Sequence, residues 1–124
     1  IRCSTTSDLA LALVATGFSY QPQRRAVQAA RLTALLPRVR DIRRMGAAAT
    51  DLCSVAAGRL DAYFEEHLGP WDLAAGELIA REAGCAVGSI DGGPVRPASV
   101  FVSNPLLFDR ARSLVHDLDA DLLD

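Results

Sequence analysis

Short apolar runs alternate with longer amphipathic segments along the chain, and this order constrains the fold more than any other feature. Short apolar or aromatic runs are typical of strands, whereas apolar residues with a helical period predict helices. Strands are predicted at residues 11–16, 38–45, 61–68, 85–90 and 99–102. Helices are predicted at residues 23–37, 46–58, 69–84 and 105–122. This alternation favours an α/β domain in which helices cover a sheet.

Two of the predicted helices have distinct apolar patterns. Residues 46–58 are apolar almost throughout, which is typical of a helix buried between layers. Residues 23–37 place several apolar side chains on one helical face, namely Ala26, Val27, Ala30, Leu32, Ala34 and Leu35. No linker or repeat divides the 124 residues, a length that suffices for one domain with a core. We therefore expect a single domain over residues 1–124.

Charge and composition argue against two classes of partner. The net charge is −2, and all 13 basic residues are arginines, some of which cluster at residues 24–25 and 38–44. A negative net charge with few aromatic residues does not support nucleic-acid binding. No apolar run approaches the roughly 20 residues that a membrane span requires. We expect neither a nucleic-acid partner nor a membrane.

The cysteines and histidines do not predict a metal centre. Cys3, Cys53 and Cys85 are odd in number, and their spacing fits no metal-binding pattern. We expect buried, reduced thiols and a cytoplasmic location. His67 and His116 are too few and too far apart for a histidine metal cluster.

Two acidic residues are candidates for a site. Asp72 stands in the first turn of the helix predicted at 69–84, where a carboxylate can cap free backbone N–H groups. It can equally be a metal ligand, because Mg²⁺ prefers carboxylate oxygens. Glu65, on the preceding predicted strand, is either an exposed member of the pair Glu65–Glu66 or a second acid in the same cleft. Two such acids can bind a metal or accept hydrogen bonds from a polyhydroxyl ligand.

The turn Gly46-Ala47-Ala48 is the third candidate. These small residues connect a predicted strand to a predicted helix, so their backbone N–H groups are open to a polar or anionic ligand. The alternative is that small residues here only permit close packing. The sequence alone leaves both interpretations open.

Longer motifs resemble a known family. The stretches IRRMGAAATDLCSVAAGRLDAYFE, residues 42–65, and PWDLAAGELIAREAG, residues 70–84, stand close together. They resemble the second half of the inositol monophosphatase family, with its motifs G-[ST]-A-A-x-D-[LM]-C-x-V-A-x-G-R-x-D-[AG]-Y and W-D-x-A-A-G. Residues 15–20 (ATGFSY), 91–94 (DGGP) and 102–105 (VSNP) are similar to further segments of that half.

This resemblance implies a layered αβ sandwich, here its carboxyl-terminal half, and Mg²⁺-dependent hydrolysis of myo-inositol monophosphate to inositol and phosphate. By position, Asp72 would be a metal ligand that also contacts the substrate, and Glu65 would bind an inositol hydroxyl. Gly46, Ala47 and Ala48 would contact the substrate at the helix start. Ala47 replaces the family's usual Ser or Thr, which removes a hydroxyl but leaves the backbone N–H. The implied partner is a small phosphorylated polyol, and the full-length form is expected to be a homodimer.

The chain also departs from the family. The family's other metal ligands, a Glu-Glu pair in its own context and a D-P-[IL]-D-G-[ST] motif, do not occur in residues 1–124. We therefore expect that the amino-terminal metal-binding half is absent, that no catalytic residue lies in this chain, and that the chain alone is inactive. Two alternatives remain open. One is a related sugar or histidinol phosphate phosphatase, and the other is a non-catalytic remnant that binds a partner.

Overall fold

The computed structural model describes residues 1–123, and it is a mixed five-stranded sheet with helices on both faces. The strands are β1 (Leu13–Thr16), β2 (Asp41–Arg43), β3 (Ala62–Glu66), β4 (Ala86–Gly88) and β5 (Ser99–Ser103). The helices are α1 (Pro22–Leu35), α2 (Ala48–Ala56), α3 (Pro70–Glu82) and α4 (Phe108–Leu123). The predicted α/β class and the predicted order of elements are both confirmed.

Several element ends differ from the predicted ones. The apolar run at 11–16 begins inside a 3₁₀ turn (Leu9–Leu11), so the strand itself starts at Leu13. Gly46 has a positive φ of 91°, and Ala47 is extended, so α2 starts only at Ala48. The last helix starts at Phe108, because Asn104 and the following turn precede it. These element ends depend on local turn geometry, which cannot be predicted from the spacing of apolar residues.

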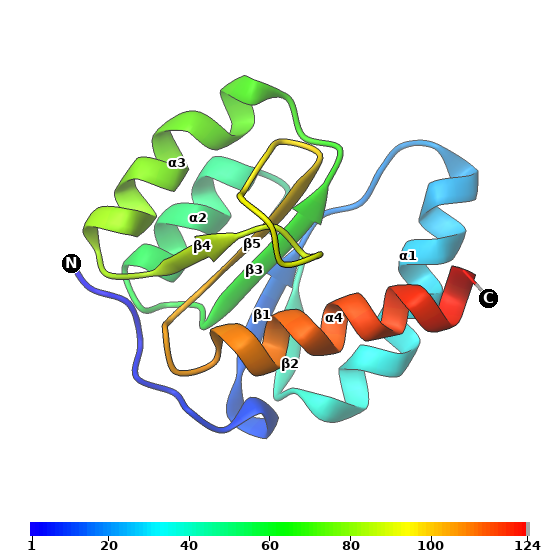
Figure 1. Ribbon diagram of the computed structural model, residues 1–124, viewed down its shortest axis with the longest axis horizontal. Helices are drawn as coiled ribbons and strands as arrows, with labels where there is room; N and C mark the ends of the chain where they lie inside the picture. Colours follow the sequence, from blue (N-terminus) through cyan, green and yellow to red (C-terminus); the bar gives the residue numbers. More distant parts are fainter. Residues whose placement is uncertain (124) are drawn as a thin grey trace.

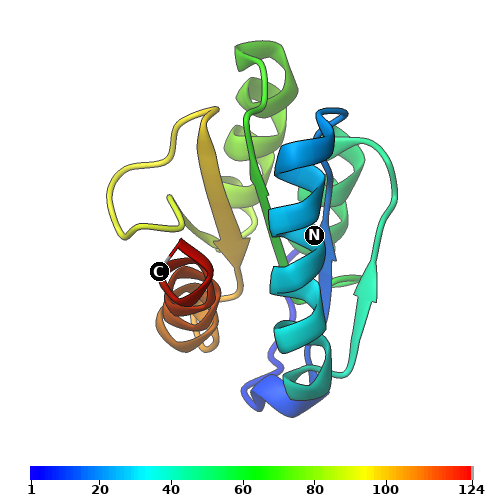
Figure 2. The ribbon, with the colours of Figure 1, turned by 90° about the vertical axis from the view of Figure 1, so that its right-hand side faces the viewer.

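The sheet is the middle of three layers. α2 and α3 pack together on one face, and α1 and α4 pack together on the other, as Figures 1 and 2 show. Figure 2 is viewed from the side of α1, which lies in front of the strands with α2 and α3 behind them. The predicted αβ sandwich is therefore confirmed.

The strand order creates a switch point near the middle of the sheet. β1 pairs in parallel with β2 on one side and with β3 on the other. The chain leaves β1 for α1 on one face but leaves β3 for α3 on the opposite face. In open α/β sheets, ligands bind at the carboxyl ends of the strands beside such a divergence. The antiparallel strands β5 and β4 extend the sheet beyond β3.

Each face of the sheet has its own core. The first, under α1 and α4, includes Val14, Leu35, Phe64 and Phe101; the second, under α2 and α3, includes Leu52 and other apolar residues. The second core is completed by Ala15, Val55, Leu60, Tyr63, Leu73, Ala80, Cys85, Val100 and Val102. Since Phe64 and Tyr63 are neighbours on β3, their opposite destinations follow from the alternation of side chains along a strand.

The predicted apolar face of α1 is largely wrong. The buried residues of this helix are Gln28, Arg31 and Leu35, whereas Val27 is 40% exposed. The polar residues are buried because they find partners: the Gln28 side-chain oxygen accepts a hydrogen bond from the Ser19 N–H at 3.0 Å. Arg31 forms an ion pair with Glu66 at 2.6 Å and lies over the Phe64 ring. Specific polar pairing has overridden the hydrophobic pattern.

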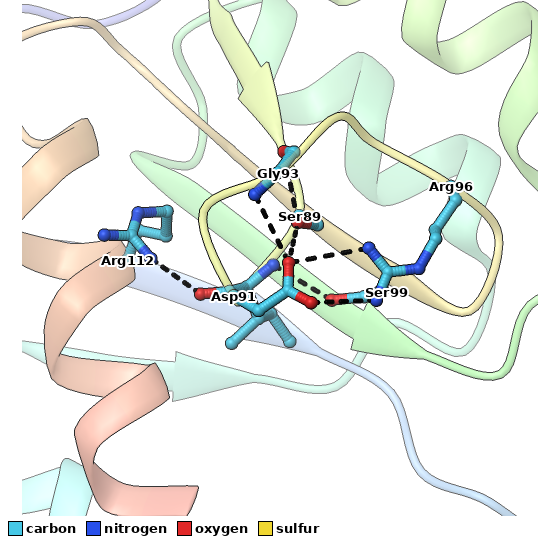
Figure 3. A network of polar contacts seen from close by, with 7 residues as sticks. Ser89, Asp91, Gly93, Arg96, Ser99 and Arg112 are labelled. Carbon is cyan, nitrogen blue, oxygen red and sulfur yellow. Dashed lines mark hydrogen bonds and ion pairs between the residues drawn. The ribbon is translucent and has the colours of Figure 1, made fainter.

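The loop between β4 and β5 is organised around Asp91 (Figure 3). Its carboxylate accepts hydrogen bonds from Ser89 Oγ and from the Gly93 N–H, and it pairs with Arg96 at 2.9 Å. The loop is also attached to the rest of the fold, because Arg112 of α4 donates to the Ile90 carbonyl at 2.8 Å. Hydrogen bonds with Arg96 and Ser89 hold the pKa of Asp91 well below its usual range.

The thiols and the helices bear on two further expectations. All three cysteines are free, but only Cys85 is buried, because Cys3 is half-buried and Cys53 is exposed. The expected burial is therefore wrong for Cys53.

Within residues 1–123, no helix combines the length and the apolar character needed to cross a membrane.

Candidate functional site

A pocket of about 110 Å³ opens at the carboxyl ends of the parallel strands. It lies where the chain leaves β1, where β2 leads into α2, and where β3 ends. The lining residues are Gly17, Phe18, Tyr20, Arg44, Gly46, Ala47, Ala48, Asp51, Glu65 and Leu68. Four of the five residues singled out in the sequence therefore line one pocket at the switch point.

Glu65 is held in this pocket by two neighbours. The hydroxyl of Tyr63, two residues earlier on the same face of β3, donates a hydrogen bond to Glu65 Oε1 at 2.6 Å. On the other side, a Cβ at Gly17 would lie only 2.2 Å from Glu65 Oε1, so the carboxylate occupies space that any larger residue would fill. Burial raises the pKa of Glu65, although the Tyr63 hydrogen bond and Arg44 act against the rise. Glu66 points instead toward α1, as its ion pair with Arg31 shows.

The start of α2 forms the opposite wall. Its N-cap residue, Ala47, provides no side-chain hydrogen bond, so the first-turn N–H groups are left without a capping side chain. Such N–H groups, at the positive end of a helix dipole, favour anionic or polar ligands. The wall therefore offers donors, whereas Glu65 offers an acceptor.

Asp51, in the first turn of α2, adds a second carboxylate. Its residue is 1% exposed, and its Oδ1 has no hydrogen-bond partner among the described residues. Burial and the nearby Glu65 raise the pKa of Asp51 to about 6, and the charge of Arg44 opposes that rise. The carboxylate is thus desolvated without being paired.

An arginine–aromatic stack borders the pocket. The guanidinium groups of Arg44 and Arg25 lie 5.7 and 5.8 Å from the centroid of the Phe18 ring. Arg25 also donates to the Ser19 carbonyl at 3.0 Å, which ties α1 to this stack. A cation over an aromatic face is attracted by the ring quadrupole. Phe18 therefore helps to hold the Arg44 charge beside the two carboxylates.

Asp72 lies near the pocket but outside its lining. Its Oδ2 accepts a hydrogen bond from the Gly69 N–H at 2.8 Å, which is the capping role that the sequence allowed. Asp72 still affects the pocket electrostatically, because its charge raises the pKa values of Glu65 and Tyr63. Asp51 acts on Tyr63 in the same way, so the charges of all three acids act on one buried hydroxyl.

The described residues do not make a metal site by themselves. Within residues 1–123, no group of three or more His, Cys, Asp and Glu side chains is arranged to hold a metal ion. Asp72 is the metal-ligand candidate from the sequence, and one of its oxygens already caps α3. A Mg²⁺ ion takes several oxygen ligands in near-octahedral geometry, so the residues present here do not suffice.

The sequence analysis missed three residues of this arrangement. Asp51 could have been recognised as a candidate site residue, because it is a single acid beside Leu52 and Val55 in an otherwise mostly apolar helix. Tyr63 was visible as the residue two positions before Glu65, which places both on one face of a strand. Arg44 was hidden within an arginine-rich run, and nothing in its spacing separates it from Arg43.

Comparisons with known proteins agree with this arrangement of the fold. A model of the inositol monophosphatase family matches residues 1–119. The chain belongs to the inositol monophosphatase family. It is 55% identical over 104 residues to the inositol-1-monophosphatase of Mycobacterium leprae, which covers 83% of the chain and 36% of that protein.

Two other family members show how widely the likeness extends. The chain is 43% identical over 108 residues to the protein named Nus factor SuhB of Vibrio cholerae, covering 85% of the chain and 40% of that protein. The solved structure of Mycobacterium tuberculosis SuhB superposes with a TM-score of 0.84 at 44% identity, covering 94% of the chain and 46% of that structure. The chain therefore spans less than half the length of these family members.

Proposed function

We propose that this chain is the carboxyl-terminal half of an inositol monophosphatase-type fold and that it carries the polyol-binding side of a phosphatase site. The reaction proposed for the complete site is hydrolysis of myo-inositol monophosphate to inositol and phosphate. The observation that carries the proposal is the pocket in which Glu65 faces the uncapped start of α2. Family membership and the likeness to a protein named inositol-1-monophosphatase support it.

The residues of this pocket suit a polyhydroxyl group. Glu65 Oε2 forms no hydrogen bond with the described part of the chain, so it can accept one from a ligand hydroxyl. The backbone N–H groups at Ala47 and Ala48 can donate to a hydroxyl or phosphoryl oxygen. A sugar-like ring presents both donors and acceptors and so complements both walls. Gly46, Ala47, Ala48 and Glu65 are accordingly the proposed substrate-binding residues.

Asp72 is proposed to bridge this polyol side and a metal. We propose that its second oxygen contributes one ligand to a Mg²⁺ site whose other ligands come from outside the described residues. Because the chain lacks the remaining carboxylates, no catalytic residue is assigned within it. The chain alone is then expected to bind substrate without turning it over.

Binding and turnover of inositol 1-phosphate test the proposal together. Chemical-shift titration of the 124-residue chain should show binding at the amides of residues 46–48, and Glu65→Gln should weaken it. Phosphate release with millimolar Mg²⁺ should be undetectable for the wild-type chain and for Asp72→Asn alike. Absence of any binding would contradict the proposed function. Release that requires Asp72 would contradict the assignment of an incomplete site.

A second candidate function is binding of a protein partner without catalysis. The incomplete carboxylate set among the described residues favours it, as does the likeness to a protein named Nus factor rather than phosphatase. A related sugar or histidinol phosphate substrate is the alternative within the enzyme class. Competition between inositol 1-phosphate, histidinol phosphate and fructose 1,6-bisphosphate for the same amides separates these substrates.

Two further expectations stay predictions. The three free cysteines are in keeping with a cytoplasmic location, which fractionation of the source cells would test. Homodimer formation by the full-length form would be measured by light scattering coupled to size exclusion.

A further inference from the structure

Asp51 is a buried carboxylate without a stated task. Its residue is 1% exposed, and its Oδ1 is the single buried side-chain oxygen or nitrogen without a hydrogen-bond partner among the described residues. An unsatisfied buried polar atom destabilises a fold, and native folds retain few of them. An unpaired carboxylate in this buried position therefore needs a physical explanation.

The surroundings of Asp51 offer that reason. Asp51 lines the same pocket as Glu65, at the other wall, in the first turn of α2. Tyr63 donates to Glu65 Oε1, whereas Glu65 Oε2 and the buried Asp51 Oδ1 have no hydrogen-bond partner among the described residues. The charge of Arg44 acts on both acids, but Arg44 forms no ion pair with either within the described part of the chain. The two pocket carboxylates therefore each keep an oxygen without a hydrogen-bond partner in residues 1–123.

We infer that Asp51 is a ligand-contacting residue of this pocket, where its Oδ1 accepts a hydrogen bond from one hydroxyl of a polyol while Glu65 binds another. This inference rests on the proposed function for the class of ligand, and it adds a residue that the family resemblance did not assign. At about 110 Å³, the pocket has room for more than one water molecule. A ring with several hydroxyl groups would present a donor to each of the two walls that carry Asp51 and Glu65.

The geometry also explains why the acid resides on a helix start. The positive end of α2 stabilises a negative charge in its first turn, so Asp51 can stay ionised although it is buried. An ionised carboxylate is an acceptor only, and it binds hydroxyl donors more strongly than a neutral group does. Asn or Leu at position 51 has a similar shape, but each lacks that charged acceptor.

Titration with myo-inositol, which carries no phosphate, tests the inference on the 124-residue chain. Binding would be followed by the amide shifts of residues 46–48. Asp51→Asn should weaken binding roughly tenfold, and Asp51→Leu should weaken it further. Both variants should melt at a higher temperature than the wild type, because the unpaired buried charge is gone. Glu66→Gln is the matched control: this neighbouring acid pairs with Arg31, lies outside the pocket lining, and should leave the affinity unchanged.

The outcomes separate this inference from the proposed function. If Glu65→Gln weakens inositol binding and both Asp51 variants bind as tightly as the wild type, Asp51 is a buried group satisfied by water, and the inference is overturned. If the wild-type chain binds neither inositol nor inositol 1-phosphate, the proposed function itself fails. If both Asp51 variants lose binding but keep a cooperative melt, the inference stands.

Discussion

The carboxylates of the pocket and the carboxylate of the β4–β5 loop have opposite environments. Asp91, which is exposed, is surrounded by donors from Ser89, Gly93 and Arg96, and its pKa is lowered (Figure 3). Asp51, which is buried, has an Oδ1 with no partner in residues 1–123, and its pKa is raised to about 6. Asp91, which organises a loop, thus has several hydrogen-bond donors around it, whereas the Oδ1 of Asp51, which lines the pocket, has none among the described residues. This difference separates a structural carboxylate from one available to a ligand.

Replacing a glycine by alanine in the pocket and in the β4–β5 loop should give the largest difference between the two regions. A Cβ at Gly17 would lie 2.5 Å from Glu65 Cδ, so Gly17→Ala should displace the end of the Glu65 side chain and abolish polyol binding. The fold itself should lose only about 1 kcal/mol, from the Tyr63–Glu65 hydrogen bond, because the displaced atoms end a flexible side chain. In the loop, a Cβ at Gly93 would meet its nearest atoms at 3.6 Å, which is ordinary contact. Gly93→Ala should therefore be close to neutral. Urea unfolding and inositol titration of the two variants measure both effects, and equal losses would erase the contrast.

Removing the charge of Asp51 should stabilise the chain. A carboxyl pKa raised from 3.8 to about 6 means that the folded state binds the proton more tightly than the unfolded state. Stability is then lost as pH rises from about 4 to about 6, and it stays lost above that range. Asp51→Asn should gain about 1–2 kcal/mol at pH 8, and most of that gain should vanish near pH 4. Urea unfolding at both pH values measures the difference; a gain that is independent of pH would contradict it.

Relieving the backbone strain at His67 should give a smaller gain in stability than the change at Asp51. His67, which follows β3, has a φ of 62°, a left-handed conformation that costs an ordinary residue about 1 kcal/mol. His67→Gly removes this cost but increases the freedom of the unfolded chain, so the net gain should be a few tenths of a kcal/mol. Thermal melts measure it. His67→Ala is the control, since alanine keeps the strain and should give no gain.

The loop carboxylate should respond least, and with the opposite sign to Asp51. The lowered pKa of Asp91 stabilises the fold above its usual pKa, and that contribution is lost as pH falls through the lowered value. Asp91→Asn should lower the melting temperature slightly at neutral pH and have less effect in strong acid. Because Arg96 is the main partner, Asp91→Asn combined with Arg96→Gln should cost less than the two changes added together. Strict additivity would show that the ion pair contributes nothing.

Sequence reasoning succeeded where a pattern depends on the backbone. Alternating apolar runs predicted the element order, and Glu65 does lie in the pocket at the strand ends, whereas Asp72 lies outside the pocket lining. It failed where a partner decides the outcome. Nothing in the spacing of α1 could show that Arg31 would be buried, because its partner Glu66 lies 35 residues away. Asp51 was overlooked for the same reason, since an unpaired acid is recognised only when its neighbours are known.

The pocket also has a simple relation to chain order. All ten lining residues come from positions 17–68, whereas the antiparallel strands β4 and β5 and the helix α4 come later. The exposed turn at residues 91–94 lies beyond the last lining residue. A nick or an insertion in that turn therefore leaves the whole binding surface on one uninterrupted piece of polypeptide. Such a nick would leave β4 on the piece that carries the pocket residues and would place β5 and α4 on the other piece.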